Sequence, residues 1–261
     1  MRITRRDLLA TTGSLASGFA LKVSASEVVA NPQDARATRP RKIRVIVCGG
    51  HPGDPEYGCG GTVAKLTQLG HEVVLMYLND GAWPPTPPTT RLAEAKKACE
   101  ILKARAAYAG QVNSHAVVDN AHYDDFQKLI AAEKPDALIT QWPLDNHSDH
   151  RATTMLSYNA WHKLGQKFAL YYYEVSDGED TLQFSPNRYV DISATESVKR
   201  AACYAHASQT PDRYYALQDD VARFRGVESG YKRAEAFLLQ LQSPFDIFPL
   251  MEHYRLGQGA E

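Results

Sequence analysis

The 261-residue chain has 44% hydrophobic residues and a formal net charge of −1, which fits one globular domain with a full core. No Lys/Arg-rich run or basic stripe follows residue 44, so nucleic acid is not an expected partner. The four cysteines are widely scattered and form no Cys-x-x-Cys pair. This spacing excludes a cysteine zinc knuckle and gives no sign of a disulfide framework.

Residues 1–25 have the features of a twin-arginine export signal. The basic start contains Arg5 and Arg6, a weakly apolar stretch follows over residues 8–21, and small residues suited to cleavage end the segment. The stretch is too short and too rich in Gly, Ser and Thr to span a bilayer, so we expect no transmembrane segment in the mature chain. The protein is therefore predicted to be periplasmic or extracellular.

The rest of the chain divides into a tether, residues 26–41, and one folded domain, residues 42–261. Short apolar runs that fit buried strands alternate there with helical periodicities. In chain order the pattern predicts a strand at 43–48, a helix ending near Leu69, a strand at 73–78, and helices over 92–102 and 124–133. A strand at 137–140, a helix over 151–163 and a strand at 168–174 follow. A capping box, Ser193 with Glu196, predicts the start of a last helix that ends near His206. This alternation predicts an α/β domain with a mainly parallel sheet and helices on both faces.

In such sheets, ligands bind at the carboxyl ends of the strands. That rule singles out three segments: 49–58, 79–90 and 142–150. The first segment contains His51 and Asp54, and the last contains His150. Two imidazoles and one carboxylate with an open position form a common catalytic zinc site, although another divalent ion fits the same donors. Either histidine alone is more often a structural residue, but the joint placement at one edge favours a metal site.

A phosphate-binding loop is the rival interpretation of the first segment. Six glycines lie among residues 49–61, between a strand and a helix, as in dinucleotide-binding folds. However, no window reads G-x-G-x-x-G, and His51-Pro52 stands where the backbone would have to approach a pyrophosphate closely. The metal site is therefore the favoured hypothesis.

Several ordered motifs resemble one known family. Residues 51–56, His-Pro-Gly-Asp-Pro-Glu, resemble its H-P-D-D-x-E signature, and Asp145-x-His147-x-Asp149-His150 resembles its second motif. Further matches are Arg91-x-x-Glu94-Ala95, Val190-Asp191-Ile192-Ser193, His206-Ala207-Ser208-Gln209 and Gly230-x-x-x-Ala234-Glu235-Ala236-Phe237. In this order, over residues 43–240, they resemble the PIG-L/LmbE-like N-acetylglucosaminyl deacetylase family.

The resemblance implies a Rossmann-like sheet and a zinc-dependent enzyme that hydrolyses the amide of N-acylated amino sugars or related conjugates. It implies that His51, Asp54 and His150 are the metal ligands. It also implies that His147 is the polarising or proton-donating histidine, with Asp145 nearby to orient it. The predicted substrate is a small molecule or an oligosaccharide.

One position departs from the family pattern. The first of the two consecutive aspartates, which acts as the general base in the family, is Gly53 here. A general base is typically worth about 10²–10⁴-fold in rate, so its loss weakens amide hydrolysis without abolishing it. Candidates for the missing role are His147, Glu56, Asp80 or a carboxylate on the substrate. The alternative is a catalytically weak or inactive relative that binds metal and carbohydrate.

Three further residues are candidate substrate contacts. Trp83, on the proline-rich loop after the second strand, offers a flat face for a sugar ring. Arg91 could hold a substrate hydroxyl or anion, or simply pair with Glu94 one turn on. His206 could reach the site or only end its helix. The sequence thus predicts an exported zinc-dependent hydrolase that removes an N-acyl group, with N-acetyl as the first expectation, from an amino sugar or glycoconjugate.

Overall fold

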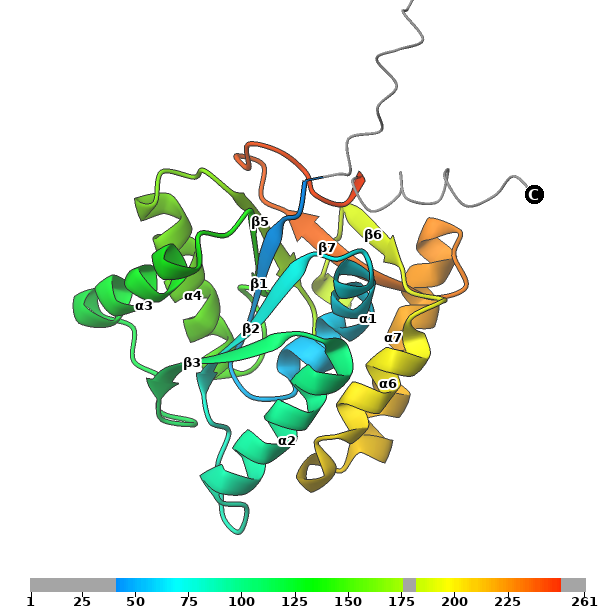
Figure 1. Ribbon diagram of the computed structural model, residues 1–261, viewed down its shortest axis with the longest axis horizontal. Coiled ribbons are helices and arrows are strands. Elements are labelled where there is room, and N and C mark those ends of the chain that lie inside the picture. Colours follow the sequence, from blue (N-terminus) through cyan, green and yellow to red (C-terminus); the bar gives the residue numbers. More distant parts are fainter. Residues whose placement is uncertain (1–40, 176–181, 250–261) are drawn as a thin grey trace, which may run out of the picture. The chain divides into compact units, whose positions relative to one another are not determined.

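The computed structural model describes residues 41–175 and 182–249 (Figure 1). These residues belong to one unit of contacts, Pro40–Glu261. The predicted export signal and the tether, apart from its last residue, lie outside the described residues, so those two predictions stay predictions. Within the described ranges, no helix is long and apolar enough to cross a membrane.

The described strands form a seven-stranded sheet in the order β3-β2-β1-β4-β5-β7-β6. Their bounds are β1 Arg44–Gly49, β2 Glu72–Asn79, β3 Arg105–Gln111, β4 Ala137–Gln141, β5 Ala169–Tyr173, β6 Arg188–Asp191 and β7 Ala234–Leu239. Strands β1 to β5 pair in parallel, whereas β7 runs antiparallel to both β5 and β6. The predicted α/β class with a mainly parallel sheet is confirmed.

Helices cover both faces of the sheet (Figure 1). Their bounds are α1 Asp54–Gln68, α2 Pro88–Leu102, α3 Asn120–Glu133, α4 Ser148–Lys163, α6 Glu196–Tyr204 and α7 Pro211–Ser229, with a short 3-10 turn, η2, at Ala207–Gln209. Alternate residues of β1 point to opposite faces, so Val45 and Val47 join the core under α1, α2 and α6, while Ile46 and Cys48 join the core under α3 and α4. Because both faces of β1 are buried, its residues 45–48 form a continuous apolar run.

Some predicted boundaries are wrong. Helix α6 begins at Glu196 behind Thr195, and Ser193 does not cap it; instead the Ser193 hydroxyl faces the carbonyl of Arg233. Helix α4 begins at Ser148, three residues earlier than predicted, because His147 acts as its N-cap and accepts the backbone N–H of Asp149. This earlier start places His150 in the first turn of α4, at the carboxyl edge of the sheet.

Candidate active site

A cavity of about 330 Å³ opens at the carboxyl ends of the central parallel strands. Its lining comes from the β1–α1 loop, the β2–α2 loop, the loop after β3, the start of α4 and the first turns of α7. The predicted edge of the sheet is therefore where the cavity lies. All three segments singled out in the sequence, 49–58, 79–90 and 142–150, contribute to it.

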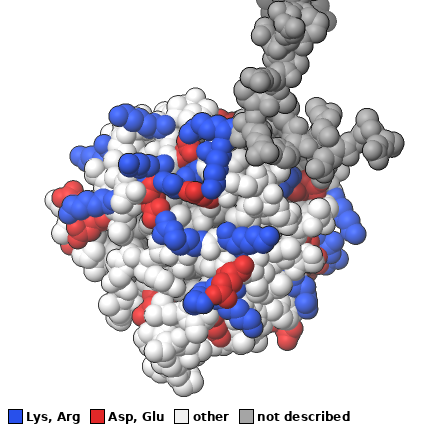
Figure 2. All heavy atoms as spheres, viewed as in Figure 1, with Lys and Arg blue, Asp and Glu red and all other residues white. Residues whose placement is uncertain are grey.

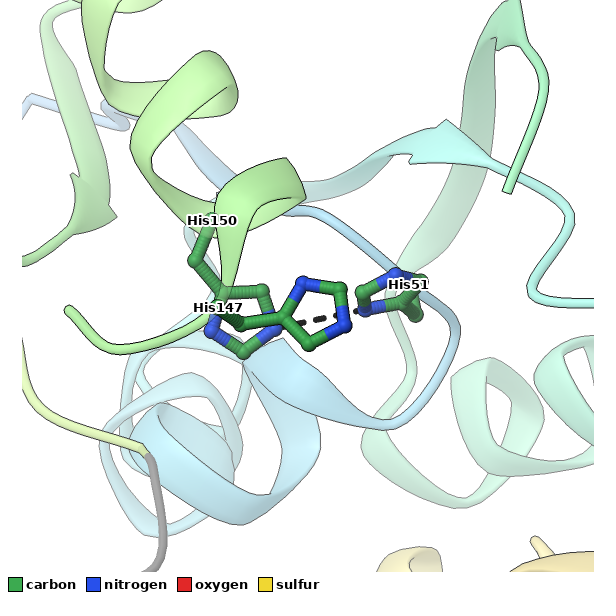
Figure 3. A group of neighbouring side chains, drawn as sticks. All are labelled: His51, His147 and His150. Carbon is green, nitrogen blue, oxygen red and sulfur yellow. Dashed lines mark hydrogen bonds between the residues drawn. The ribbon is translucent and has the colours of Figure 1, made fainter. Parts of the chain in front are cut away.

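The three predicted metal ligands converge on one point of this cavity. Asp54 Oδ2 lies 3.1 Å from His51 Nδ1 and 3.0 Å from His150 Nε2. The two imidazole nitrogens lie 3.3 Å apart, the contact dashed in Figure 3. Asp54 is the first residue of α1, so the helix N-terminus directs its carboxylate to this place.

The spacing of these donor atoms fits a four-coordinate zinc ion. Zinc bonds of about 2.0–2.1 Å at tetrahedral angles place neighbouring donors roughly 3.3–3.4 Å apart. The three distances between His51, Asp54 and His150 are within a few tenths of an ångström of that edge length. Three protein donors also leave the fourth position open, as in catalytic sites. The donor set therefore fits the metal that the sequence predicted.

His147 is the alternative third donor. Its ring lies 4.7 Å from the rings of both His51 and His150, and the potential ligand atoms of the three histidines all fall within 4.8 Å (Figure 3). Asp54 contacts the two ligand histidines more closely. In addition, His147 Nδ1 already accepts the N–H of Asp149. By distance, Asp54 is therefore the better candidate for the third donor, and His147 lies beside the three.

Two buried carboxylates hold the ligand histidines from behind. Asp149 Oδ2 accepts from His51 Nε2 at 3.1 Å, and Asp145 Oδ2 accepts from His150 Nδ1 at 2.9 Å. Each bond fixes the tautomer that presents the other ring nitrogen to the metal position. The sequence placed Asp145 beside His147; the structure instead shows it orienting the ring of His150, while its second oxygen accepts only the backbone N–H of His147.

The charges around the donors suit a doubly charged cation. Burial lowers the pKa of His150, but the Asp54 carboxylate and the hydrogen bond to Asp145 raise it more, to about 10. The pKa of His51 is raised in the same way, by Asp54 and Asp149 acting against burial. Burial raises the pKa of Asp54, but the two histidines hold it well below its usual range. Two protons can thus leave as one divalent ion enters, with little change in net charge.

Gly53 leaves the base position without a side chain. Its φ of +112° is a conformation that L-residues rarely adopt. A Cβ placed there would meet Cδ2 and Cε2 of Tyr57 at 3.6 Å, so the position has room but its backbone disfavours a side chain. Among the described residues, Asp54 is the one carboxylate on the cavity lining.

The other protein carboxylates considered for the base role do not line the cavity. Glu56 is fully buried, and its carboxylate is hydrogen-bonded to Tyr77 Oη at 2.7 Å, His206 Nε2 at 3.0 Å and the N–H of Gly53 at 3.2 Å. Asp80 accepts the N–H of Ala82 and is absent from the lining. Of the candidates from the sequence, His147 and a substrate carboxylate remain.

The three predicted substrate contacts, Trp83, Arg91 and His206, differ in how they lie relative to the cavity. Trp83 lines the cavity with 58% of its surface exposed. Arg91 also lines it, but the side chain is buried and donates to the Pro52 carbonyl at 2.5 Å and to Glu94 at 3.3 Å. Arg91 therefore holds the metal-binding loop in place. His206 is 0% exposed and lies behind Gly53 on Glu56, so the structure gives it no direct contact with the cavity.

Two groups of lining residues were not predicted from the sequence. Asn113 and Ser114 follow β3, an alanine-rich edge strand that the sequence pattern did not reveal. Tyr214, Leu217 and Gln218 come from α7, which was also missed. If β3 had been recognised in the sequence, the turn residues after it would have indicated Asn113 and Ser114. The position of the α7 residues depends on how that helix packs, which the sequence pattern does not show.

An α/β domain with a two-histidine, one-carboxylate site at the carboxyl edge of its sheet defines a class of candidate metal-dependent hydrolases. The family model of PIG-L, GlcNAc-PI de-N-acetylase, matches residues 46–161, which hold both metal-site loops. Over this stretch the chain is similar to the PIG-L/LmbE-like family of de-N-acetylases, the family that its motifs resemble.

Individual relatives agree with this assignment. The diacetylchitobiose deacetylase of Thermococcus kodakarensis is 29% identical over 226 residues, covering 74% of this chain and 81% of that protein. The protein TT1542 of Thermus thermophilus shares the fold with a TM-score of 0.69 and 24% identity, over 78% of this chain and 97% of its own. The N,N'-diacetylchitobiose deacetylase of Pyrococcus horikoshii has a TM-score of 0.67 and 21% identity, over 80% and 88%.

The same fold also carries other chemistry. The 4-carboxy-2-hydroxymuconate hydratase GalB of Pseudomonas putida aligns with a TM-score of 0.64 and 19% identity, over 79% of this chain and 97% of its own. The fold alone therefore does not decide the reaction.

Proposed function

We propose that this protein is an exported zinc-dependent hydrolase that removes an N-acyl group, with N-acetyl as the reference case, from an amino sugar or glycoconjugate. The observation that carries the proposal is the convergence of His51, Asp54 and His150 within 3.3 Å of one another, in a cavity of a domain similar to the PIG-L family. A zinc ion held there would polarise the acyl oxygen and activate the attacking water.

His147 is proposed to stabilise the developing charge on the acyl oxygen. Burial and the neighbouring charges of His150 and His51 lower its pKa, which keeps the imidazole neutral at pH 7. Because Nδ1 accepts the N–H of Asp149, the ring proton is on Nε2, where it can be donated into the cavity. As the water oxygen joins the acyl carbon and the C–N bond breaks, the leaving amine takes up the proton that the attacking water gives up, so His147 keeps its own proton.

Trp83 and the neutral polar groups nearby are proposed to bind the sugar. Trp83 is exposed at the cavity and suits stacking on a sugar ring, while Asn113, Ser114 and Asn146 offer donors and acceptors for hydroxyls. Arg91 holds the Pro52 carbonyl and so positions the loop that carries His51 and Asp54. These groups supply binding and orientation rather than proton transfer.

A specific observation also favours a second candidate, a metal- and carbohydrate-binding relative with weak or no catalysis. No carboxylate of the described ranges other than Asp54 lines the cavity, so the usual protein base is missing. Amine release separates the two functions. Zinc-loaded protein should release free amine from N-acetylglucosamine or N,N'-diacetylchitobiose, lose the activity with a chelator, and regain it with zinc. Binding of these saccharides without amine release would favour the binding protein.

The export route is a proposal of its own. It rests on Arg5 and Arg6 ahead of a short apolar stretch. Replacing both residues by lysine should retain the protein inside the cell, as measured by fractionation. Unchanged secretion of that variant would contradict a twin-arginine signal.

A further inference from the structure

One wall of the cavity is apolar and aromatic. It consists of Tyr57, Val175, Tyr214 and Leu217, which we call the aromatic wall. The rings of Tyr57 and Tyr214 lie 6.4 Å apart at 71°, an edge-to-face contact. Tyr214 and Leu217 are three residues apart on α7, so they share one helix face.

The aromatic wall carries no charge. Burial raises the pKa of Tyr57 far above neutral pH, so its hydroxyl stays protonated and donates to the Cys203 carbonyl. Asn113, Ser114 and Asn146 line the cavity from other loops, and the uncharged amide of Gln218 lines it from α7, next to Leu217. The two kinds of lining suit the two ends of an N-acyl amino sugar, a polar sugar and an apolar acyl chain.

Gly53 lies next to both the proposed metal position and the aromatic wall. It precedes the ligand Asp54, and the nearest side chain to its missing Cβ is the ring of Tyr57, at 3.6 Å. A carboxylate at this position would place a charge against that ring. Because the residue is glycine, position 53 places no charged side chain against that ring.

We infer that the aromatic wall binds the acyl group of the substrate and that this protein accepts N-acyl groups longer than acetyl. The inference rests on the proposed function, because the acyl carbonyl must lie at the metal for its chain to reach the wall. Burying one methylene stabilises binding by up to about fourfold in affinity. Affinity should therefore rise with chain length until the wall is covered.

Binding of the carboxylate product tests the inference without requiring turnover. Zinc content of the protein is measured first, and acetate, butyrate and hexanoate are then titrated by calorimetry into the zinc-loaded form. We expect the Kd to fall by roughly two- to fourfold per added methylene. Tyr214→Ala and Leu217→Ala should flatten this dependence, while their Kd for acetate changes little.

Phe224→Ala is the matched control, because Phe224 is an aromatic residue on α7 that is half exposed and absent from the lining. It should keep the wild-type dependence on chain length. A Kd that does not change from acetate to hexanoate, or an equal slope in Tyr214→Ala and wild type, would overturn the inference while leaving the metal site intact. Failure to bind zinc would instead overturn the proposed function, and the inference with it.

Discussion

Two neighbouring residues at the start of α1, Gly53 and Asp54, contribute to the site in opposite ways. Asp54 Oδ2 is surrounded by the His51 ring, the His150 ring, the backbone N–H of His51 and the amide of Gln141. Gly53, one residue earlier, presents no side chain, and the nearest group to its missing Cβ is an aromatic ring. The proposed metal donors thus all converge on one point, while position 53 offers no side chain.

The largest expected effect comes from restoring the carboxylate. Gly53→Asp should raise kcat for an N-acetyl saccharide by about 10²–10⁴-fold, because a carboxylate next to Asp54 can accept the proton of the attacking water. It should also lower turnover of longer acyl groups, because the charge faces Tyr57. Steady-state kinetics on an acetyl and a hexanoyl substrate measure both effects.

Gly53→Asn is the control for that variant. It has nearly the same shape and the same unfavourable φ but cannot act as a base. Both variants should lose about 1–3 kcal/mol of stability from the backbone at φ +112°. Thermal unfolding and zinc content check this cost. A stable, zinc-loaded Gly53→Asp protein no faster than Gly53→Asn would show that the carboxylate is not the missing part.

The next largest effect concerns the carboxylates behind the ligand histidines. Asp145→Asn and Asp149→Asn should each weaken zinc binding by about 10–100-fold, because each removes the anionic acceptor that fixes a ligand histidine. Competition with a chromophoric chelator measures the Kd. Asp125→Asn, on the exposed surface of α3, should leave it unchanged. Equal affinities in all three variants would contradict the role of these bonds.

The stability of the metal-free protein is expected to depend on pH. The pKa of His150 is about 10 in the folded state, above its ordinary value of 6.5, because Asp54 and Asp145 outweigh burial. The stabilisation is complete below pH ~6.5 and is lost as the pH rises towards 10, with a slope of at most about 1.4 kcal/mol per pH unit for this proton. Denaturant unfolding from pH 6.5 to 10 should show this decline. Stability that rises over this range would contradict the assignment.

The smallest effect is expected at Trp83. Stacking on a sugar contributes similarly to ground and transition states, so Trp83→Ala should raise KM several-fold with little change in kcat. Because the side chain is 58% exposed, stability should change by under about 0.5 kcal/mol. Unchanged kinetics on every active saccharide would show that Trp83 is a surface residue that does not bind the sugar.

The sequence could predict that His51, Asp54 and His150 lie together because each follows a strand closely. His51 and Asp54 lie in one loop after an apolar strand, and His150 follows another, so the edge rule for parallel sheets places them together. The strands β1, β2, β4 and β5 could be predicted for the same reason, since buried parallel strands are continuous apolar runs.

The aromatic wall could not be predicted because α7 does not show an ordinary amphipathic pattern. Its buried face includes Gln218 and Arg225, whose guanidinium forms an ion pair with Glu174, while Phe224 and Val227 are exposed. Apolar periodicity therefore does not mark the face that packs inward. Only tertiary packing shows that Tyr214 lies next to Tyr57.

One face of the molecule carries charged side chains of both signs. On the face drawn in Figure 2, Lys and Arg side chains lie in several places beside Asp and Glu, and uncharged residues cover most of the remaining surface.

Zinc content of matched histidine variants tests the central claim most directly. Wild-type protein and His162→Ala, which changes an exposed histidine of α4, should each hold about one zinc per chain after loading and dialysis. His150→Ala, which changes the ligand at the start of the same helix, should retain almost none. Equal zinc in His150→Ala and His162→Ala, or no zinc in the wild type, would contradict a metal site built from His51, Asp54 and His150.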